Sequence, residues 1–271
     1  MSSAIPTIEQ MEEEYYKRFL NYTPNKKQEL FHIAGITAQE RLITGGNRSG
    51  KTFCGEEEFS AHWTGIYNES WKGYRFDRPV RCWVAGKTAA LIAETIQKDL
   101  FGDKEQNLRG MIHPSLIKEK KKSGNSEMYR TVYIRHVSGG ASKITFKTYE
   151  EGREAFQAGK IDLALMDEEP PFNVYQECKM RTMATDEHAR GMIVVCSTPL
   201  KGYSDFFNYF MDDRHPEEVK DSRWHAHITW EDALHLPFEE KKRLLAGMSP
   251  HEIEARTNGI PWPGSGLVYP V

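Results

Sequence analysis

The sequence predicts an α/β fold in which a mainly parallel β-sheet is covered by helices on both faces. Short apolar runs alternate along the chain with stretches of helical spacing, which is the pattern of strand–helix–strand units. Several runs are almost entirely apolar, such as GMIVVC at residues 191–196, as expected of parallel strands buried on both faces. The length of 271 residues fits one sizeable domain, alone or with a small appendage.

In the first half of the chain, the expected elements place a glycine-rich loop between a strand and a helix. They are a helix at 9–20, a second helix at 25–33 after Pro24, a strand at 40–44, a helix at 49–63, a strand at 80–85 and a helix at 88–100. In the helix at 49–63, Phe53, Phe59 and Trp63 lie on related faces. Residues 102–126 are polar, rich in lysine and weakly patterned.

The second half predicts more of the sheet and then a change of character. Expected strands lie at 131–136, 143–149, 161–166 and 191–196, with the first two antiparallel across a glycine turn at 138–140. After Lys201, helices at 204–211 and 238–246 flank a strand at 224–230. This part resembles a small subdomain rather than more of the sheet. Residues 259–271 are rich in Pro and Gly and predict a linker.

Composition gives no sign of a membrane protein and leaves a nucleic-acid partner open. No apolar run approaches a membrane span, and the N-terminus lacks the apolar segment of a signal peptide. The net charge is −3, but the run KEKKK at 118–122, followed by Arg130 and Arg135, is either a DNA contact or a solvated loop. The cysteines have no metal-ligand spacing and predict reduced thiols of a cytosolic protein: Cys54, Cys82, Cys178 and Cys196.

Residues 45–52 (GGNRSGKT) match the pattern G-x-x-x-x-G-K-[ST] of a phosphate-binding loop. Glycines let backbone N–H groups turn toward phosphate oxygens, and the following helix adds its N-terminal dipole. Lys51 would reach the β- and γ-phosphates, and Thr52 would supply a hydroxyl ligand to Mg²⁺. A glycine turn with a surface lysine fits less well, because the match lies between an apolar strand and a helix. The match predicts a nucleoside triphosphatase of the P-loop class, with phosphate contacts at Gly45, Gly46, Asn47, Arg48, Ser49, Gly50, Lys51 and Thr52.

Three acidic residues follow the apolar run IDLALM. Asp167, at the end of that strand, can hold the water shell of Mg²⁺. Glu168 can orient and deprotonate an attacking water, and Glu169, one residue further out, is the weaker candidate. The alternative is an acidic N-cap for the helix after residues 170–171, which an acidic triplet at the end of a buried strand fits poorly.

Ser197, Thr198 and Pro199 end the next apolar strand. A hydroxyl there faces the same crevice as the phosphates, because the carboxyl ends of parallel strands share one edge of the sheet. Thr198 is therefore a candidate contact to the γ-phosphate. The local sequence fits a simple strand-terminating turn equally well.

The ordered set of motifs resembles one family, the large terminase subunit of tailed double-stranded DNA viruses, which is a DNA-packaging motor. TPNKKQELF, with Gln28, is similar to its adenine-recognising glutamine motif, and residues 45–52 are similar to its Walker A motif. LALMDEEP at 163–170 resembles its Walker B motif with catalytic Glu168, and STPLKG at 197–202 resembles its coupling motif. The resemblance covers most of the chain up to the coupling motif.

The resemblance implies a P-loop NTPase of the ASCE type, a three-layer sandwich with an ATPase core at 1–202 and a lid subdomain at 203–258. It implies ATP and Mg²⁺ at the site, double-stranded DNA as the substrate that is moved, and a ring of identical subunits. It further implies the portal protein and the small terminase subunit as partners, in the host cytoplasm. Chains of the family continue into a metal-dependent nuclease domain with an RNase H-like fold. We therefore expect residues 259–271 to be the linker to that domain, and no DNA cleavage by this chain.

Two arginines are candidates for stabilising the transition state, since a guanidinium can bridge two phosphate oxygens. Arg153, in GREAFQ, resembles the family's residue that acts on the neighbouring subunit and is the first choice. Arg48, inside the phosphate loop, either acts in cis or points to solvent. Gln28 would give ATP preference over GTP, because its amide can donate to and accept from the adenine edge; a surface glutamine is the plainer interpretation.

The sequence thus predicts the ATPase motor domain of a terminase, which moves DNA into a procapsid. Two alternatives stay open: a helicase-like DNA-dependent ATPase, and a nucleotide-gated assembly module that hydrolyses little. A helicase would be expected to carry a second motor domain. Glu168 argues against a module without hydrolysis.

Overall fold

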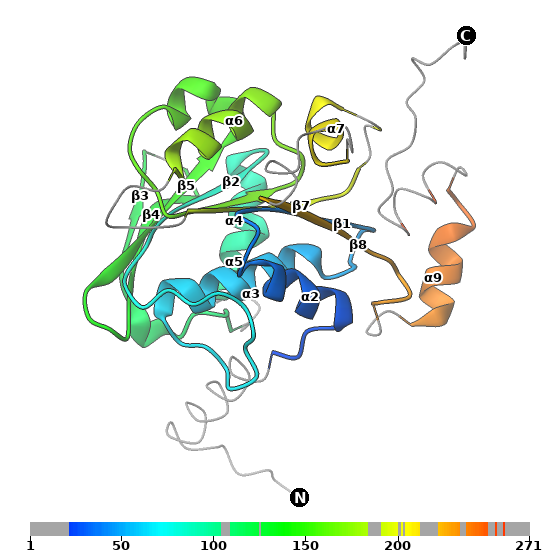
Figure 1. Ribbon diagram of the computed structural model, residues 1–271, viewed down its shortest axis with the longest axis horizontal. Helices are drawn as coiled ribbons and strands as arrows, with labels where there is room; N and C mark the ends of the chain where they lie inside the picture. The colour runs from blue at the N-terminus through cyan, green and yellow to red at the C-terminus, as the bar shows by residue number, and fades with distance from the viewer. Residues whose placement is uncertain are drawn as a thin grey trace, which may run out of the picture.

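The computed structural model describes residues 22–103, 109–124, 126–183, 191–199, 204–211, 222–233 and 237–248, together with residues 202, 253 and 257. The helix expected at 9–20 and the linker expected at 259–271 lie outside these residues. Figure 1 shows a central sheet seen nearly edge-on, with a layer of helices on each side. The predicted α/β fold with three layers is confirmed.

The sheet formed by the described residues has eight strands in the order β3-β4-β5-β2-β6-β7-β1-β8. Neighbouring strands from β5 to β8 in this order are parallel, whereas β4 is antiparallel to both of its neighbours, β3 and β5. The bounds are β1 Glu40–Gly45, β2 Arg81–Gly86, β3 Ile117–Lys122, β4 Tyr129–Arg135, β5 Ala141–Thr148, β6 Leu163–Asp167, β7 Met192–Ser197 and β8 Arg223–Ile228.

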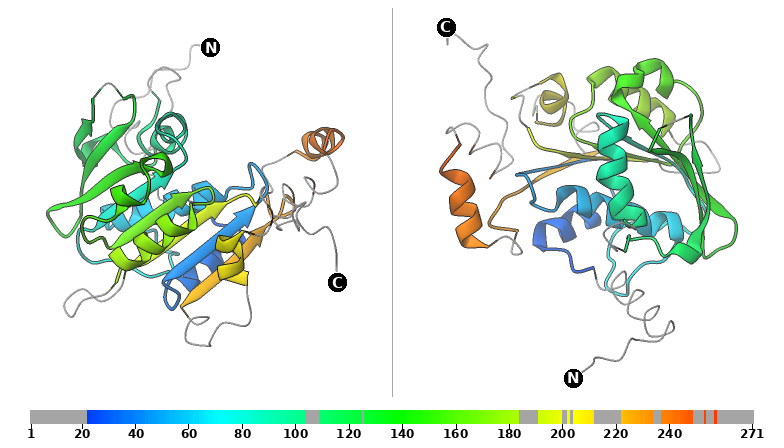
Figure 2. Two further views of the ribbon diagram at one scale, coloured as in Figure 1. Left: turned by 90° about the horizontal axis from the view of Figure 1, so that it is seen from above. Right: turned by 180° about the vertical axis from the view of Figure 1, so that it is seen from behind.

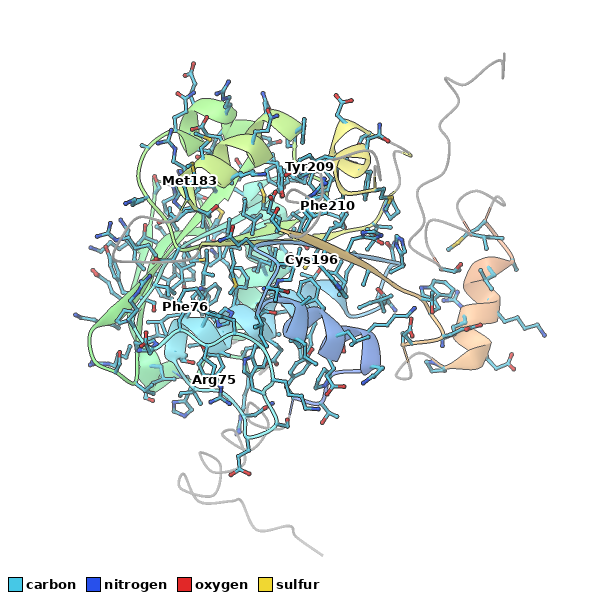
Figure 3. All side chains as sticks on the ribbon, in the orientation of Figure 1. Arg75, Phe76, Met183, Cys196, Tyr209 and Phe210 are labelled. Atoms are coloured by element: carbon cyan, nitrogen blue, oxygen red, sulfur yellow. The ribbon has the colours of Figure 1, made fainter. Side chains whose placement is uncertain are left out.

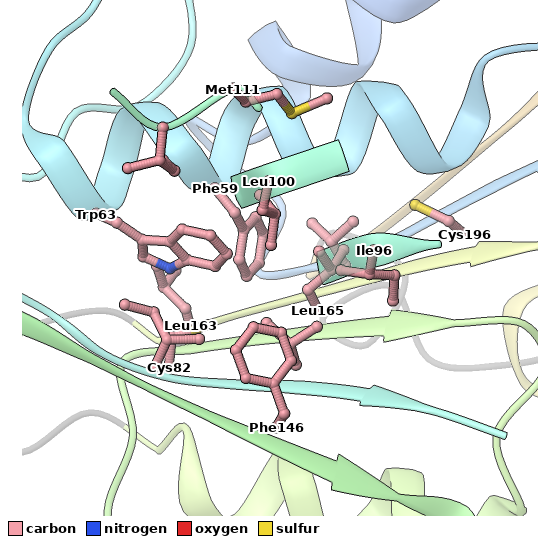
Figure 4. Close-up of a cluster of buried hydrophobic side chains, with 14 of the residues drawn as sticks. Phe59, Trp63, Cys82, Ile96, Leu100, Met111, Phe146, Leu163, Leu165 and Cys196 are labelled. Carbon is pink, nitrogen blue, oxygen red and sulfur yellow. The ribbon is translucent and has the colours of Figure 1, made fainter. Parts of the chain in front are cut away.

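Each face of the sheet has its own apolar core. On the face that we call the α3 face, Phe59 and Trp63 pack with strand residues such as Phe146 and Leu165 (Figure 4). The opposite face, called the α6 face, has a smaller core. The helices are α2 Lys26–Ala34, α3 Lys51–Thr64, α4 Ala89–Glu94, α5 Ile96–Phe101, α6 Phe172–Arg181, α7 Asp205–Met211 and α9 Phe238–Leu245, with 3₁₀ turns η1 Pro114–Leu116, η2 Tyr149–Glu151 and η3 Arg153–Phe156.

The strand expected at 224–230 belongs to the main sheet, so the expectation of a separate subdomain there is wrong. β8 pairs in parallel with β1 over the whole length of both strands. Helix α7 also belongs to the core, because Phe206 and Phe207 are buried on the α6 face. Figure 3 shows its neighbouring residues Tyr209 and Phe210 above the sheet, on that face. Of the expected lid, the helix α9 lies beyond the sheet edge formed by β8 (Figure 1).

Two further elements differ from the sequence prediction. The polar stretch at 102–126 contains β3, an edge strand paired with β4. This strand was not predicted, because its lysines do not alternate with apolar residues. The expected helix at 88–100 is divided into α4 and α5 at Thr95, where φ is −111° and ψ is −85°. The Thr95 hydroxyl donates a hydrogen bond to the Leu91 carbonyl at 2.7 Å, which closes the first helix with a side chain.

A buried ionic cluster ties α2 and β1 to the helix α3. The guanidinium of Arg41 donates to Glu58 Oε2 at 2.9 Å and to the Phe31 carbonyl at 2.8 Å, and it also contacts Glu58 Oε1. His32 Nδ1 lies 2.7 Å from Glu58 Oε2, and His62 Nε2 lies 3.3 Å from Glu58 Oε1. Burial alone would raise the pKa of Glu58, but the charge of Arg41 and the two histidine contacts hold that pKa well below its usual range.

Replacing Glu58 by alanine is expected to lower the free energy of unfolding by about 3–5 kcal/mol, because the buried Arg41 would lose its carboxylate. Urea unfolding followed by circular dichroism measures this loss. Since the pKa of Glu58 is depressed, its contribution is present at neutral pH and is lost as the pH falls below 4.5. The difference between the two proteins should therefore shrink in acid.

The neighbouring Glu57→Ala provides the control, because burial raises the pKa of Glu57 to about 7 and its charged form is not favoured by the fold. The double variant Arg41→Met/Glu58→Ala should recover much of the loss, since the Arg41 guanidinium is then no longer buried without its carboxylate. Equal losses for Glu57→Ala and Glu58→Ala at neutral pH would contradict the assigned role.

Candidate nucleotide-binding site

The predicted phosphate loop joins β1 to α3 at the carboxyl edge of the sheet. Gly50 has a φ of 86° and forms the cap from which α3 begins, and Arg48 has a φ of 61°. A Cβ atom on Gly45 would lie 2.5 Å from Ser49 Oγ and 2.7 Å from the Ile228 carbonyl oxygen. Only glycine fits there, because both atoms belong to the packed loop and strand.

The side chains of the loop divide into buried and exposed ones. Lys51 is only 6% exposed, although it is a lysine at the start of a helix. Ser49 Oγ is buried, and no described atom hydrogen-bonds to it. Asn47 and Arg48 are exposed. A buried hydroxyl that needs a partner, beside a buried ammonium at a helix N-terminus, fits a bound phosphate group.

Thr52 and Asp167 are brought together although 115 residues separate them in the chain. Thr52 Oγ1 donates a hydrogen bond to Asp167 Oδ1 at 2.9 Å. Burial of its carboxyl and the charge of Glu168 raise the pKa of Asp167 to about 6, against the lowering effect of the Thr52 hydrogen bond. Two adjacent oxygens, one of them a carboxylate short of positive partners, fit a divalent cation such as Mg²⁺.

No described group of three or more His, Cys, Asp or Glu side chains could hold a metal ion. Mg²⁺ does not need such a cage, because it keeps several waters and takes its remaining ligands from one or two side chains and substrate phosphates. The pair of Thr52 and Asp167 therefore fits this ion better than one that needs an all-protein site.

Glu168 has a left-handed backbone, with a φ of 61°. This conformation costs a non-glycine residue of order 1–3 kcal/mol and is found most often at functional sites. Its N–H donates to the Cys196 carbonyl at 2.8 Å, and its Oε2 accepts from the Thr198 N–H at 3.2 Å. The turn of the backbone separates the Glu168 side chain from that of Asp167, so the two adjacent carboxylates have different contacts.

Thr198 links the end of β7 to the phosphate loop. Its hydroxyl lies 3.5 Å from Asn47 Oδ1, and its side chain is almost fully buried. The Asn47 carbonyl accepts a hydrogen bond from Trp230 Nε1 at 3.1 Å. Trp230, which follows β8, was not singled out from the sequence, because 183 residues separate it from Asn47 and no local pattern signals the contact.

Tyr149 is a second site residue that the sequence did not indicate. Its hydroxyl lies 3.0 Å from the Asp167 carbonyl oxygen, 3.3 Å from the Glu168 carbonyl oxygen and 3.4 Å from the Ala85 carbonyl oxygen. The phenol thus holds the turn after β6 against the end of β2. Its only sequence signal is a tyrosine directly after the strand β5.

Gln28 is buried and contacts the phosphate loop. Its Nε2 donates to the Gly50 carbonyl at 3.1 Å, and its Oε1 accepts from the Asn25 N–H at 2.9 Å in a capping box of α2. The interpretation as a surface glutamine is therefore wrong. Both ends of the amide are engaged within the protein, so its reading of adenine stays a prediction.

Arg153 lies on η3, which follows the carboxyl end of β5, and its side chain is 56% exposed. Its Nε lies 3.1 Å from Glu177 Oε2 in α6. Glu177 also contacts Arg181 at 2.5 Å. The structure thus places Arg153 on the surface beside the site edge of the sheet, where a neighbouring molecule can reach it.

No helix among the described residues is both long and apolar enough to cross a membrane. The buried Cys54, Cys82, Cys178 and Cys196 are free thiols, in agreement with the sequence prediction.

Comparisons with known proteins agree on one family. Residues 42–271 match the family described as terminase large subunit, T4-like-virus type, N-terminal. The chain is 31% identical to the terminase large subunit of Salmonella phage P22 over 284 residues, which cover 96% of this chain and 55% of that protein. It is 32% identical over 101 residues to the terminase large subunit of Enterobacteria phage LP7, covering 37% and 19%. The chain therefore spans about half of the P22 relative.

Solved structures share the fold at low sequence identity. A large terminase from a thermophilic bacteriophage, in complex with ADP, superposes with a TM-score of 0.58 and 14% identity, covering 86% of this chain and 52% of that one. The large terminase ATPase domain of Thermus phage P74-26 superposes with a TM-score of 0.53 and 19% identity, covering 89% and 95%.

Proposed function

Because the chain belongs to the terminase large-subunit family, we propose that it hydrolyses ATP with Mg²⁺ to move double-stranded DNA into a viral procapsid. The observation that carries this proposal is the meeting of three motifs at one edge of the sheet. The phosphate loop, the Thr52–Asp167 pair and the turned Glu168 lie at the carboxyl ends of β1, β6 and β7. This is the edge at which open α/β sheets bind their ligands.

The residues of the chain divide the work of hydrolysis. Lys51 and the loop amides hold the phosphates, and Thr52 and Asp167 hold the metal. Glu168 accepts a proton from the water whose oxygen bonds to the γ-phosphorus, while the bond from that phosphorus to the ADP oxygen breaks. Bound Mg²⁺ supplies positive charge to the phosphate oxygens.

Two hydrogen-bond contacts support Thr198 as the residue that senses the state of the nucleotide. Its N–H binds the Glu168 carboxylate and its hydroxyl contacts Asn47 of the phosphate loop. A change of either partner during hydrolysis changes the hydrogen bonds at the start of the segment that leads to α7. We assign Thr198 the coupling role on this ground.

The wider proposal concerns assembly. By membership in the family, the chain acts in the host cytoplasm as part of a ring of identical subunits, with a portal protein and a small terminase subunit as partners. The ATPase core includes β8, so the lid is limited to the region around α9. ADP bound to the large terminase with the TM-score of 0.58 supports adenine nucleotides as ligands, with Gln28 as the residue that reads the base.

Asp167→Asn tests the metal site and the reaction together. The variant is expected to lose at least about 100-fold in Mg²⁺-dependent phosphate release, because metal ions contribute several kcal/mol of transition-state stabilisation. EDTA should abolish the wild-type rate. A wild-type chain that binds ATP without Mg²⁺-dependent hydrolysis would instead be a nucleotide-gated assembly module.

The same variant should gain stability. The folded-state pKa of Asp167 is raised from 3.8 to about 6, so its ionised form opposes folding above pH 6. Asparagine removes that charge and should add about 1–2 kcal/mol to the unfolding free energy at pH 7.5. The gain should vanish as the pH falls from 6 to 4, and the exposed Asp77→Asn should show no such change.

A further inference from the structure

The α6 face of the sheet carries positive side chains on its antiparallel strands. In β4, Val132 and Ile134 are buried in the core of the α3 face. Because side chains alternate along a strand, Tyr133 and Arg135 lie on the opposite, α6 face. Lys121 of β3 belongs to the same face, since its Nζ lies 5.5 Å from the centre of the Tyr133 ring.

The next two strands continue this surface. In β5, Ile144 is buried in the α3-face core, so the neighbouring Lys143 lies on the α6 face. In β2, Trp83 is buried in the α6-face core, and Arg81, two residues before it, lies on the same face. Arg81 and Lys143 are direct partners in the register of the sheet, as are Lys143 and Tyr133. We call Arg81, Lys121, Arg135 and Lys143 the basic strip.

The helices of the α6 face leave the basic strip uncovered. Seen from above (Figure 2, left), α6 lies over the middle of the sheet, and the antiparallel strands extend beyond it. All four residues of the strip are exposed, and Tyr133 between them is partly exposed. The strip thus offers a flat, open surface rather than a groove closed by protein.

A pocket of about 410 Å³ extends the surface beyond Arg81, at the amino ends of β2 and β6. Arg78 and Lys160 line it together with Arg81 and Asp162. Arg78 binds Asp162 at 2.7 Å, so that pair is neutral. Met183, at the end of α6 above the sheet (Figure 3), forms another side of the pocket.

The charge of the strip contrasts with that of the chain. The whole sequence carries a net charge of −3, yet the strip gathers four cations with Glu119 as the acid in register beside Tyr133. Glu119 lies 3.2 Å from Lys121 and offsets one of these charges. Since adjacent strands lie about 4.8 Å apart, the strip from β3 to β2 is about 14 Å wide. That width spans about four phosphates of one DNA strand, which are spaced about 3.4 Å along the helix axis.

We propose that the basic strip binds the phosphate backbone of double-stranded DNA. The proposal rests on the proposed function and names the surface by which this domain holds its substrate. Lysine and arginine supply the charge, and the hydroxyl of Tyr133 can donate to a phosphate oxygen, as hydroxyl side chains do at protein–DNA interfaces. These side chains would contact phosphates rather than base edges, so binding would not depend on the DNA sequence. A motor that moves DNA of any sequence requires such binding.

The sequence had pointed to residues 118–122 as a whole, and the structure divides that run. Lys120 lies over the rings of Phe101 and Tyr129, with its Nζ 4.6 Å and 4.9 Å from the ring centres. It covers the core at the edge of the sheet and is left out of the strip. Lys121 lies over the Tyr133 ring instead.

Lys121→Ala/Lys143→Ala tests the proposal by fluorescence anisotropy with a labelled duplex of mixed sequence. The dissociation constant at 0.1 M salt should rise about tenfold or more, and the slope of its logarithm against the logarithm of salt should fall by about 1–2. The control is Lys26→Ala/Lys72→Ala, which also removes two exposed lysines and should bind DNA like the wild type.

Equal affinity and salt slope for the two double variants would overturn the proposal, as would a wild-type chain that binds no duplex. ATP hydrolysis without DNA should be the same in both variants, because the strip lies outside the nucleotide site. The proposed function fails separately: loss of Mg²⁺-dependent hydrolysis in the wild type would refute the ATPase and leave the DNA measurement unaffected.

Discussion

Glu168→Gln should lower steady-state ATP hydrolysis by a factor of about 10² to 10⁴, the range that a general base contributes. Glutamine keeps the length of the side chain and an oxygen that can accept the Thr198 N–H, which Glu168 Oε2 accepts at 3.2 Å. It cannot take a proton from water. The loss should therefore appear in the maximal rate, measured as phosphate release at saturating ATP, with nucleotide binding close to that of the wild type.

The neighbouring Glu169→Gln is the matched control, since it makes the same chemical change one residue further along the chain. Its rate should stay within about threefold of the wild type, as expected of a change outside the reacting groups. If Glu169→Gln were the inactive variant and Glu168→Gln the active one, the assignment of the base would be wrong. Equal rates for all three proteins would refute a carboxylate base at this turn.

Arg153→Ala should lower hydrolysis by a factor of about 10³ to 10⁵ if Arg153 stabilises the transition state of a neighbouring subunit. The residue is exposed and lies beside the site edge of the sheet, where its Nε contacts Glu177. Release from that carboxylate would let the guanidinium reach a second molecule. Wild-type turnover per subunit should consequently rise with protein concentration, because subunits must meet to complete a site.

Mixing two inactive variants shows whether Arg153 acts on the site of a neighbouring subunit or on the site of its own subunit. Arg153→Ala supplies an intact Glu168, and Glu168→Gln supplies an intact Arg153. In a head-to-tail ring formed from an equal mixture, about a quarter of the interfaces combine a subunit with intact Glu168 and a neighbour with intact Arg153. About a quarter of the wild-type rate should therefore return. A mixture as inactive as its parts would place the action of Arg153 within one subunit. An active Arg153→Ala would leave Arg48 as the remaining candidate.

The fold was predictable where burial leaves a local pattern in the sequence. β6 and β7 are apolar because both faces are covered, and their predicted ranges agree with the structure within about two residues. β3 was missed because it is an edge strand in which no residue is fully buried and most are exposed. β8 was found as a strand but assigned to the wrong unit, because its pairing with β1 depends on contacts about 180 residues apart.

The site was predictable as a set of motifs but not as a set of contacts. The sequence placed Thr52 and Asp167 in motifs that bind the same ion, and the structure joins them by a hydrogen bond. The left-handed backbone of Glu168 has no sequence signal, since residues other than glycine rarely adopt it. Trp230 and Tyr149 contact backbone atoms of distant segments. Every residue type has these backbone atoms, so such a contact does not depend on the partner's residue type and cannot be seen in the sequence.

The position of β1 has a consequence for the order of folding during synthesis. β1 starts at residue 40, and its two neighbours in the sheet, β7 and β8, end at residues 197 and 228. At about 5–20 residues per second, a ribosome needs roughly 10–40 seconds to pass from the first of these strands to the last. Until residue 197 has been made, β1 has neither of its two native neighbours, and until residue 228 has been made it can pair only with β7. The loop that follows it therefore gains its final support only when β8 has left the ribosome, late in the making of the domain.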